Sequence, residues 1–182
     1  VDVDLKNPEK ILDYSIEPLL CESDGDSFDS AGVTPLCALR EQDHIKLYYA
    51  GWKNIKGTSE RYTLFTGLAI GDKNANRFVR YSDTPIIDGR EKNENIRTAG
   101  QVLKIDNKYF SFVATQKGQR EIKGKSVPIY DLECATSYDG KVWGNEQTSV
   151  FSHKIGKILG YGRSAIWENK HNTFEGLFSV RG

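Results

Sequence analysis

Short apolar runs, separated by polar turns, follow one another along the whole chain. The runs are rich in Val, Ile, Tyr, Phe and Thr, and Gly, Asn, Asp and Ser interrupt them. No stretch sustains apolar residues at helical spacing, so the pattern favours strands throughout. In its first complete stretch it predicts four strands, over residues 34–40, 45–52, 64–70 and 78–82. The sequence therefore predicts an all-β fold.

This pattern repeats about every 65 residues. The segment 33–39 is echoed by 98–104 and again by 162–168, which brings Pro35, Gly100 and Ser164 to matching positions. A polar turn and a second apolar run follow each echo. A period of this length, filled with short strands, is typical of the blades of a β-propeller.

The repeats divide the chain into blades. We expect the end of one blade over residues 1–27, complete blades over 28–90 and 91–155, and the start of another over 156–182. Residues 1–182 would then form a single, partial propeller domain. Because a propeller needs at least four blades to close, the remainder is expected to come from flanking sequence.

One turn within the second complete blade has a specific expected structure. In the stretch Ser137-Tyr138-Asp139-Gly140-Lys141-Val142-Trp143, we expect the side chain of Asp139 to bind its own backbone. Trp143 is expected to pack between blades.

Composition and charge narrow the function classes. Lys and Arg total 25 and Asp and Glu total 25, so the net charge is zero and nothing favours binding to nucleic acid or to an anionic membrane. Three cysteines, two of them inside apolar strands, do not indicate a disulfide framework. With no signal peptide and no run of 18 apolar residues, the chain is expected to be cytoplasmic. The histidines lack companions at metal-ligand spacing and no phosphate-binding glycine loop is present, so we expect neither metal nor cofactor.

Two acidic residues fall at equivalent places in the repeat. Asp29 precedes Pro35 by six residues, and Glu94 precedes Gly100 by six. Equivalent positions before the inner strands of successive blades face one shared pocket, so we expect the two carboxylates to face each other across it. Paired carboxylates in different environments are the arrangement that glycoside hydrolysis uses. The alternative is that Asp29 caps its own turn and Glu94 is a solvated loop charge.

Further candidates for substrate binding lie near the same expected pocket. Arginines at the mouth of a channel can hold a carboxylate, a phosphate or a pair of sugar hydroxyls, or can instead pair with the acidic residues. Aromatic residues there can stack on a sugar ring or simply pack between blades. The candidates are Arg97, Arg163, Arg181, Trp52 and Tyr161.

Several of these motifs together resemble a known group of proteins. The runs 28–35, 47–52 and 67–70 are similar to those of five-bladed β-propeller proteins related to glycoside hydrolase families 43, 32 and 130. Further similar segments are 97–99, 128–130, 137–143, 160–163 and 179–182. The resemblance covers nearly the whole chain and implies a funnel-shaped pocket that binds a carbohydrate.

The resemblance also implies roles for the two carboxylates. Asp29 would be the aspartate that positions and tunes the other catalytic groups, and Glu94 would be the acid. The expected base lies upstream of Val1. We therefore expect a glycoside hydrolase that acts on an oligosaccharide or polysaccharide. Two alternatives stay open: a glycoside phosphorylase, which Arg97 and Arg163 would suit, and a non-catalytic sugar-binding propeller module.

Overall fold

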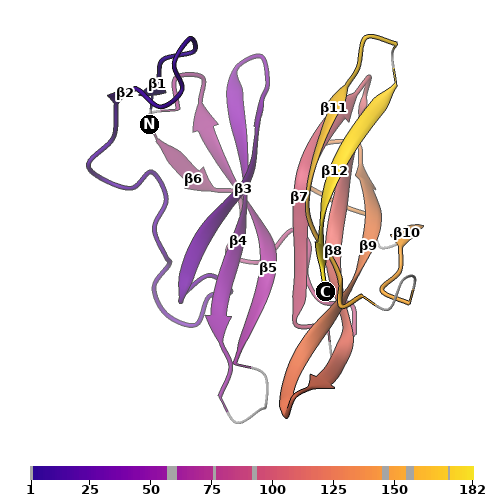
Figure 1. Ribbon diagram of the computed structural model, residues 1–182. Helices are drawn as coiled ribbons and strands as arrows, with labels where there is room; N and C mark the ends of the chain where they lie inside the picture. Colours follow the sequence, from indigo (N-terminus) through magenta and orange to yellow (C-terminus); the bar gives the residue numbers. More distant parts are fainter. Residues whose placement is uncertain are drawn as a thin grey trace.

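The structure, a computed structural model, is built from strands, turns and loops (Figure 1). It describes residues 2–56, 61–75, 77–91, 94–144, 148–154, 158–171 and 173–182. No helix occurs within these ranges, which confirms the expected all-β fold. The strands are β1 (Asp2–Val3), β2 (Ile11–Asp13), β3 (Gly32–Arg40), β4 (His44–Asn54), β5 (Tyr62–Asp72), β6 (Phe78–Arg80), β7 (Ile96–Ile105), β8 (Lys108–Ile122), β9 (Lys125–Ser137), β10 (Thr148–Phe151), β11 (Gly160–Glu168) and β12 (Phe174–Arg181).

The large sheet consists of antiparallel units that are joined through short parallel pairings between neighbouring strands. Its order is β12-β11-β9-β8-β7-β5-β4-β3, with β6 paired to β5 and β10 paired to β9. Two short parallel pairings join the units: Leu64 lies opposite Ile96 between β5 and β7, and Tyr130 lies opposite Gly160 between β9 and β11. Figure 1 shows the resulting curl, with β3 to β5 on one side and β7 to β12 on the other. The unit boundaries fall at β5–β7 and β9–β11.

The four strands predicted between residues 34 and 82 are confirmed as β3, β4, β5 and β6, each within a few residues. The sequence repeat also has a direct spatial counterpart, because residues one repeat apart touch. The backbone N–H of Val102 donates to Sγ of Cys37 at 3.4 Å. A Cβ added at Gly100 would overlap Oγ of Ser164. The number of blades in a complete ring stays a prediction.

The core lies between the first two units. Tyr48, Leu68 and Val113 are almost fully buried there, together with Trp143. The rings of Tyr48 and Trp143 meet edge to face with centroids 6.3 Å apart, which confirms that Trp143 packs across units. The expected turn is also confirmed, since Oδ1 of Asp139 accepts hydrogen bonds from two backbone N–H groups of that turn. The turn also contacts the first unit, because the hydroxyl of Tyr48 donates to the carbonyl oxygen of Gly140 at 2.9 Å.

Gly160 is required where β11 meets β9. Its φ is +138°, and a Cβ there would overlap the backbone of Tyr130, lying 2.6 Å from the nitrogen. We expect Gly160→Ala to destabilise the protein by about 1–3 kcal/mol, since both backbone strain and overpacking oppose the side chain. Denaturant unfolding measures this. Gly32→Ala is the control, because Gly32 has nearly the same φ (+140°) but nothing within 4 Å of an added Cβ. An equal loss in both variants would attribute the effect to backbone strain alone.

The cysteines and the possible membrane-spanning segments bear on the expectations drawn from composition. Cys21, Cys37 and Cys134 are all free thiols. Over the part of the chain that the structure describes, no helix is long and apolar enough to cross a membrane. The compartment stays a prediction.

Candidate functional site

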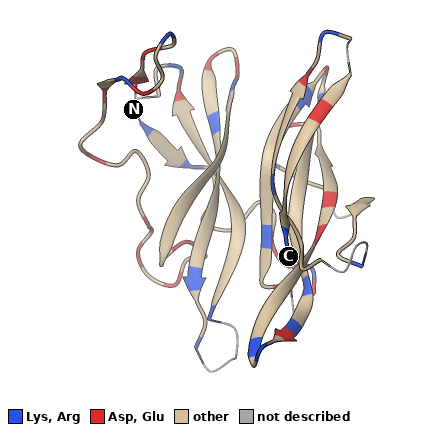
Figure 2. Cartoon of the chain, viewed as in Figure 1, with Lys and Arg blue, Asp and Glu red and all other residues tan. Residues whose placement is uncertain are grey.

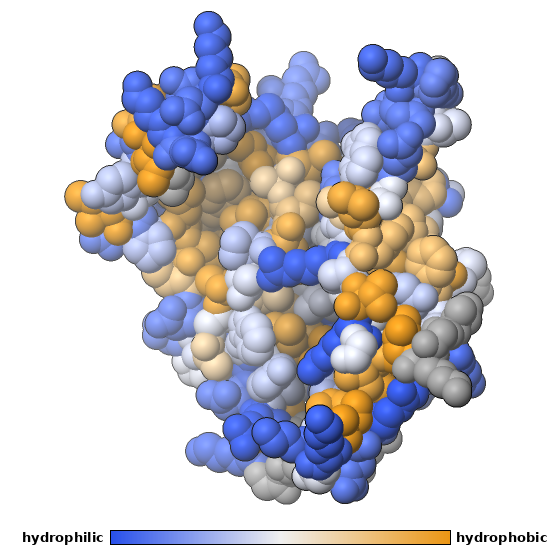
Figure 3. All heavy atoms as spheres, in the orientation of Figure 1, coloured by the Kyte–Doolittle hydropathy of each residue, from blue (hydrophilic) through white to orange (hydrophobic). Residues whose placement is uncertain are grey.

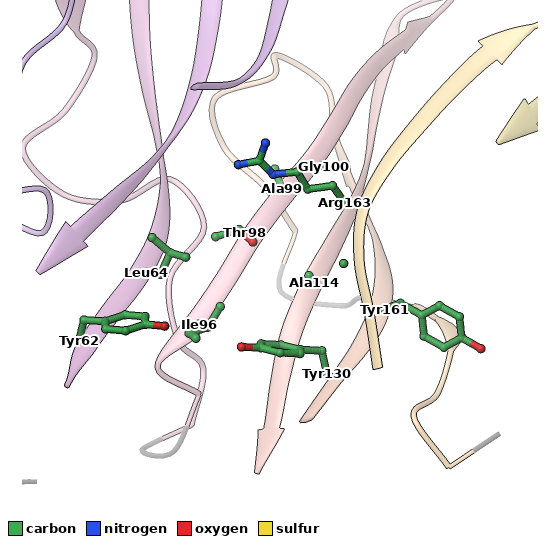
Figure 4. Close-up of a pocket in the computed structure, with 11 residues that line it drawn as sticks. Tyr62, Leu64, Ile96, Thr98, Ala99, Gly100, Ala114, Tyr130, Tyr161 and Arg163 are labelled. Carbon is green, nitrogen blue, oxygen red and sulfur yellow. The ribbon is translucent and has the colours of Figure 1, made fainter. Parts of the chain in front are cut away.

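A pocket of about 170 Å³ lies where β5, β7 and β11 begin (Figure 4). It crosses both unit boundaries, but neither Asp29 nor Glu94 lines it; Glu94 lines another pocket, of about 810 Å³, together with Asp26 and Phe28. The residues that line the first pocket are Tyr62, Leu64, Ile96, Thr98, Ala99, Gly100, Ala114, Tyr130, Tyr161, Gly162 and Arg163. Two of the substrate-binding candidates, Tyr161 and Arg163, are therefore in this lining.

Two tyrosines from different units face each other across this pocket. Figure 4 shows the rings of Tyr62 and Tyr130 on opposite sides of Ile96, with their hydroxyl groups directed inward. Two other candidates contact these rings. The Trp52 ring lies 4.9 Å from that of Tyr62, and Cζ of Arg181 lies 5.8 Å from the centre of the Tyr130 ring. Trp52 and Arg181 therefore hold the pocket walls rather than line the pocket.

Arg163 and Tyr161 enter the lining from β11 in different ways. In Figure 4 the guanidinium of Arg163 extends towards Ala99 and Gly100, whereas the ring of Tyr161 turns away from the pocket. That ring packs against Phe151, with centroids 5.1 Å apart. Of the two, Arg163 is the side chain placed to contact a ligand.

A second, larger pocket continues from the first. It has a volume of about 530 Å³ and shares Tyr62 and Ile96 with its neighbour. Its remaining lining residues are Arg61, Gln116, Gln119, Lys125, Ser126 and Pro128. We call the two pockets together the groove. The groove has room for more than one sugar ring.

Arg97 and Glu94 lie outside the groove lining, in a buried charged cluster. Ile96 and Thr98 line the first pocket, while the guanidinium of Arg97 donates to the carbonyl oxygen of Asp88. Oε1 of Glu94 lies 3.0 Å from Nη2 of Arg90 and 2.9 Å from Nζ of Lys117. We define the charged cluster as Arg90, Glu94, Arg97, Lys117 and Glu133.

Glu133 shares the cations of Glu94. Its carboxylate lies 2.9 Å from Arg90 and 2.9 Å from Lys117, and it accepts a further hydrogen bond from the hydroxyl of Thr115. Both glutamates are almost fully buried. Two cations therefore bridge two buried carboxylates, which fixes the loop before β7 against β8 and β9.

The environment of Glu94 determines its protonation state. Burial raises its pKa, but hydrogen bonds from Arg90 and Lys117 outweigh burial and lower the pKa to about 2. A general acid must carry its proton at the working pH. In this arrangement Glu94 is ionised and pairs with cations, so the acid role expected from the sequence stays a prediction.

Asp29 lies in a separate buried cluster. Its Oδ2 is 2.8 Å from Nε of Arg80 and 3.1 Å from the hydroxyl of Tyr49, and its Oδ1 accepts from the hydroxyls of Ser23 and Ser27. Burial raises the pKa of Asp29, yet these hydrogen bonds outweigh it and hold the pKa below its ordinary value. Among the described residues, Asp29 and Glu94 share no hydrogen-bond or ion-pair partner. The structure thus gives each carboxylate its own set of donors.

The described residues offer no cluster for a metal ion. No group of three or more His, Cys, Asp or Glu side chains in these ranges could hold one.

Comparisons with known proteins agree with a propeller-type fold. No family model matches the chain. Two curated relatives from Mycobacterium tuberculosis, "Uncharacterized protein MT1551" and "Uncharacterized protein Rv1502", are each 29% identical over 143 residues, which covers 79% of this chain and 46% of theirs. The chain thus spans about half the length of these relatives.

Among solved structures, the Bombyx mori GH32 beta-fructofuranosidase BmSUC1 has a TM-score of 0.58 at 16% identity and covers 91% of this chain and 30% of its own. A mutant of that enzyme in complex with sucrose has a TM-score of 0.53 at 13% identity and covers 79% of this chain and 32% of its own. At these identities the likeness concerns the fold alone. The chain has the propeller-type fold of these neighbours.

Proposed function

We propose that this chain forms part of a carbohydrate-active propeller and binds an oligosaccharide in the groove. The observation that carries the proposal is the pair of tyrosines, Tyr62 and Tyr130, that face each other across the pocket from different units. Each ring offers a flat apolar face and a hydroxyl group, the combination that a sugar ring with its C–H face and hydroxyl edge can use. Thr98 and Arg163 add a small number of polar contacts, as is usual for ligand pockets.

The solved neighbours support a sugar ligand. Both are GH32 beta-fructofuranosidases, and one is in complex with sucrose. Because such likeness establishes the fold only, it adds weight to the tyrosine argument and does not replace it.

The proposal includes a complete five-bladed ring, with the missing blades supplied by flanking sequence. Apolar side chains on the last strand support this part. Leu177 of β12 is 67% exposed, and Figure 3 shows apolar atoms gathered over this strand. By the alternation of side chains along the strand, Leu177 lies on the face opposite Phe178, which packs against Phe112 of the preceding unit, so a neighbouring blade would cover Leu177.

Hydrolysis of a glycosidic bond is the second candidate function, because the solved neighbours are glycosidases. It belongs to the whole ring, since hydrolysis needs a protonated acid and both Asp29 and Glu94 have lowered pKa values here. A phosphorylase would differ only in requiring inorganic phosphate as the nucleophile. Turnover with and without phosphate separates these reactions.

Binding should depend on Tyr130. For the intact gene product we expect calorimetry against an oligosaccharide panel to detect binding, and Tyr130→Ala to weaken it about tenfold, which corresponds to ~1.4 kcal/mol. Tyr138→Ala is the matched control, because Tyr138 is 82% exposed and lies outside the groove lining. Equal affinities for the wild type and Tyr130→Ala would remove the groove as the binding site.

A further inference from the structure

We propose that the oligosaccharide bound in the groove is acidic, with carboxylate, sulfate or phosphate groups on its sugar rings. This inference rests on the proposed function, since it specifies the ligand of the same groove. It concerns the charge of the ligand, which neither the fold nor the neighbours determine.

The groove is cationic although the chain as a whole is neutral. Its described lining contains Arg61, Lys125 and Arg163 and no Asp or Glu. The whole chain carries 25 Lys and Arg and 25 Asp and Glu, and Figure 2 shows both signs distributed over the strands and loops. The charge of the groove is therefore a local excess and does not reflect a basic protein.

These three cations are also available. In the part of the chain that the structure describes, none of their side chains forms a hydrogen bond or an ion pair with another residue. The contrast with Arg80 and Arg90 is direct, because their guanidinium groups are paired with buried carboxylates. All three groove cations are exposed, so a ligand can reach them without breaking an existing contact.

The cations stand at both ends of the sugar-binding surface. Arg163 lines the first pocket, Arg61 and Lys125 line the second, and Tyr62 belongs to both. A sugar lying on the tyrosines would thus have a cation near each end. The planar guanidinium of Arg163 can hold a carboxylate, sulfate or phosphate by two parallel hydrogen bonds. A neutral sugar would leave these charges without counterions.

The test uses the intact gene product and paired ligands. Acidic oligosaccharides of several backbones, among them uronate-containing and sulfated ones, are each compared with a chemically neutralised form, such as the carboxyl-reduced oligosaccharide. Calorimetry is run at low and at physiological ionic strength. We expect an acidic form to bind at least tenfold more tightly than its neutral partner. The preference should shrink as salt rises, because exposed charges are screened.

Single substitutions test whether the preference for acidic over neutral oligosaccharides arises in the groove. Arg163→Gln and Lys125→Gln are each expected to reduce the preference severalfold, because each removes a charge that only the acidic form can pair with. Lys170→Gln is the matched control, since Lys170 is exposed in the turn between β11 and β12 and lies outside the groove lining. If the control reduced the preference equally, the preference would not arise in the groove and the proposal would fail.

Three outcomes would overturn the inference in distinguishable ways. Equal affinity for acidic and neutral forms would reject the acidic ligand but leave sugar binding in place. Binding of inorganic phosphate alone as tight as that of any oligosaccharide would show that the cations serve a free anion and not an acidic sugar. No binding of any oligosaccharide would reject the proposed function together with the inference.

Discussion

Asp29→Asn is expected to destabilise the protein by about 3–5 kcal/mol, the usual cost of removing one partner from a buried ion pair. The carboxylate of Asp29 is fully buried and pairs with Arg80 at 2.8 Å. Asparagine keeps the shape, but it replaces one acceptor oxygen by an NH₂ donor that faces other donors. Arg80 then keeps its charge without a carboxylate. Denaturant unfolding at neutral pH, compared with the wild type, measures the loss.

A nearby aspartate provides the control. Asp26 pairs with Lys53 at 2.9 Å, but its side chain is 96% exposed, so Asp26→Asn should change stability little. Wild-type stability in Asp29→Asn would contradict the anchoring role of Asp29. It would then favour the positioning and tuning role that the resemblance implies for Asp29.

The local pattern of apolar and polar residues was sufficient to predict the strands. Residues 34–82 divide into apolar runs and polar turns, and β3 to β6 follow that division. In β4 and β5 the runs 48–51 and 66–69 are buried on both faces of the strand. The repeat added spatial information that single-strand patterns lack. It matched Gly100 with Ser164, and these residues touch, which accounts for a glycine where a side chain would have no room.

The sequence predicted two of the groove-lining residues, but neither candidate carboxylate is among them and the partners of those carboxylates were not predictable. The repeat placed Arg163 and Tyr161 at the entrance of an inner strand, and both line the groove. It also paired Asp29 with Glu94, yet their partners come from other strands. Arg80 lies 51 residues from Asp29, and no local spacing rule reaches that far.

One sequence signal could have revealed the charged cluster. Glu133 stands between Leu132 and Cys134 in an apolar run, and a charge in such a run must find a buried counterion. Tyr62 and Tyr130 gave no comparable signal, because tyrosine is common in strands. Their meeting depends on the parallel pairings between units, which sequence periodicity does not specify.

Glu94→Gln separates the structural role of Glu94 from the acid role. Because Glu94 pairs with Arg90 and Lys117 in a buried cluster, we expect a loss of about 3–5 kcal/mol in the free energy of unfolding. The pH dependence gives a second readout. The pKa of Glu94 is about 2 in the folded protein against an ordinary 4.5, so its stabilisation is complete above pH 4.5 and is lost as the pH falls towards 2. The variant should lack this part of the acid destabilisation, and unfolding curves collected between pH 2 and 7 would show it.

Glu133→Gln is the matched control for Glu94→Gln. Glu133 binds the same two cations at 2.9 Å, so removing its charge should cost similar stability. If both variants lose stability alike and any oligosaccharide turnover falls in proportion to the folded fraction, Glu94 acts through the charged cluster. If Glu94→Gln alone abolishes turnover while it stays folded and keeps sugar affinity within an order of magnitude, Glu94 contacts the substrate. Such a result would require the pKa of Glu94 to rise when a sugar displaces Lys117 or Arg90, because only a protonated carboxyl can donate to the leaving oxygen.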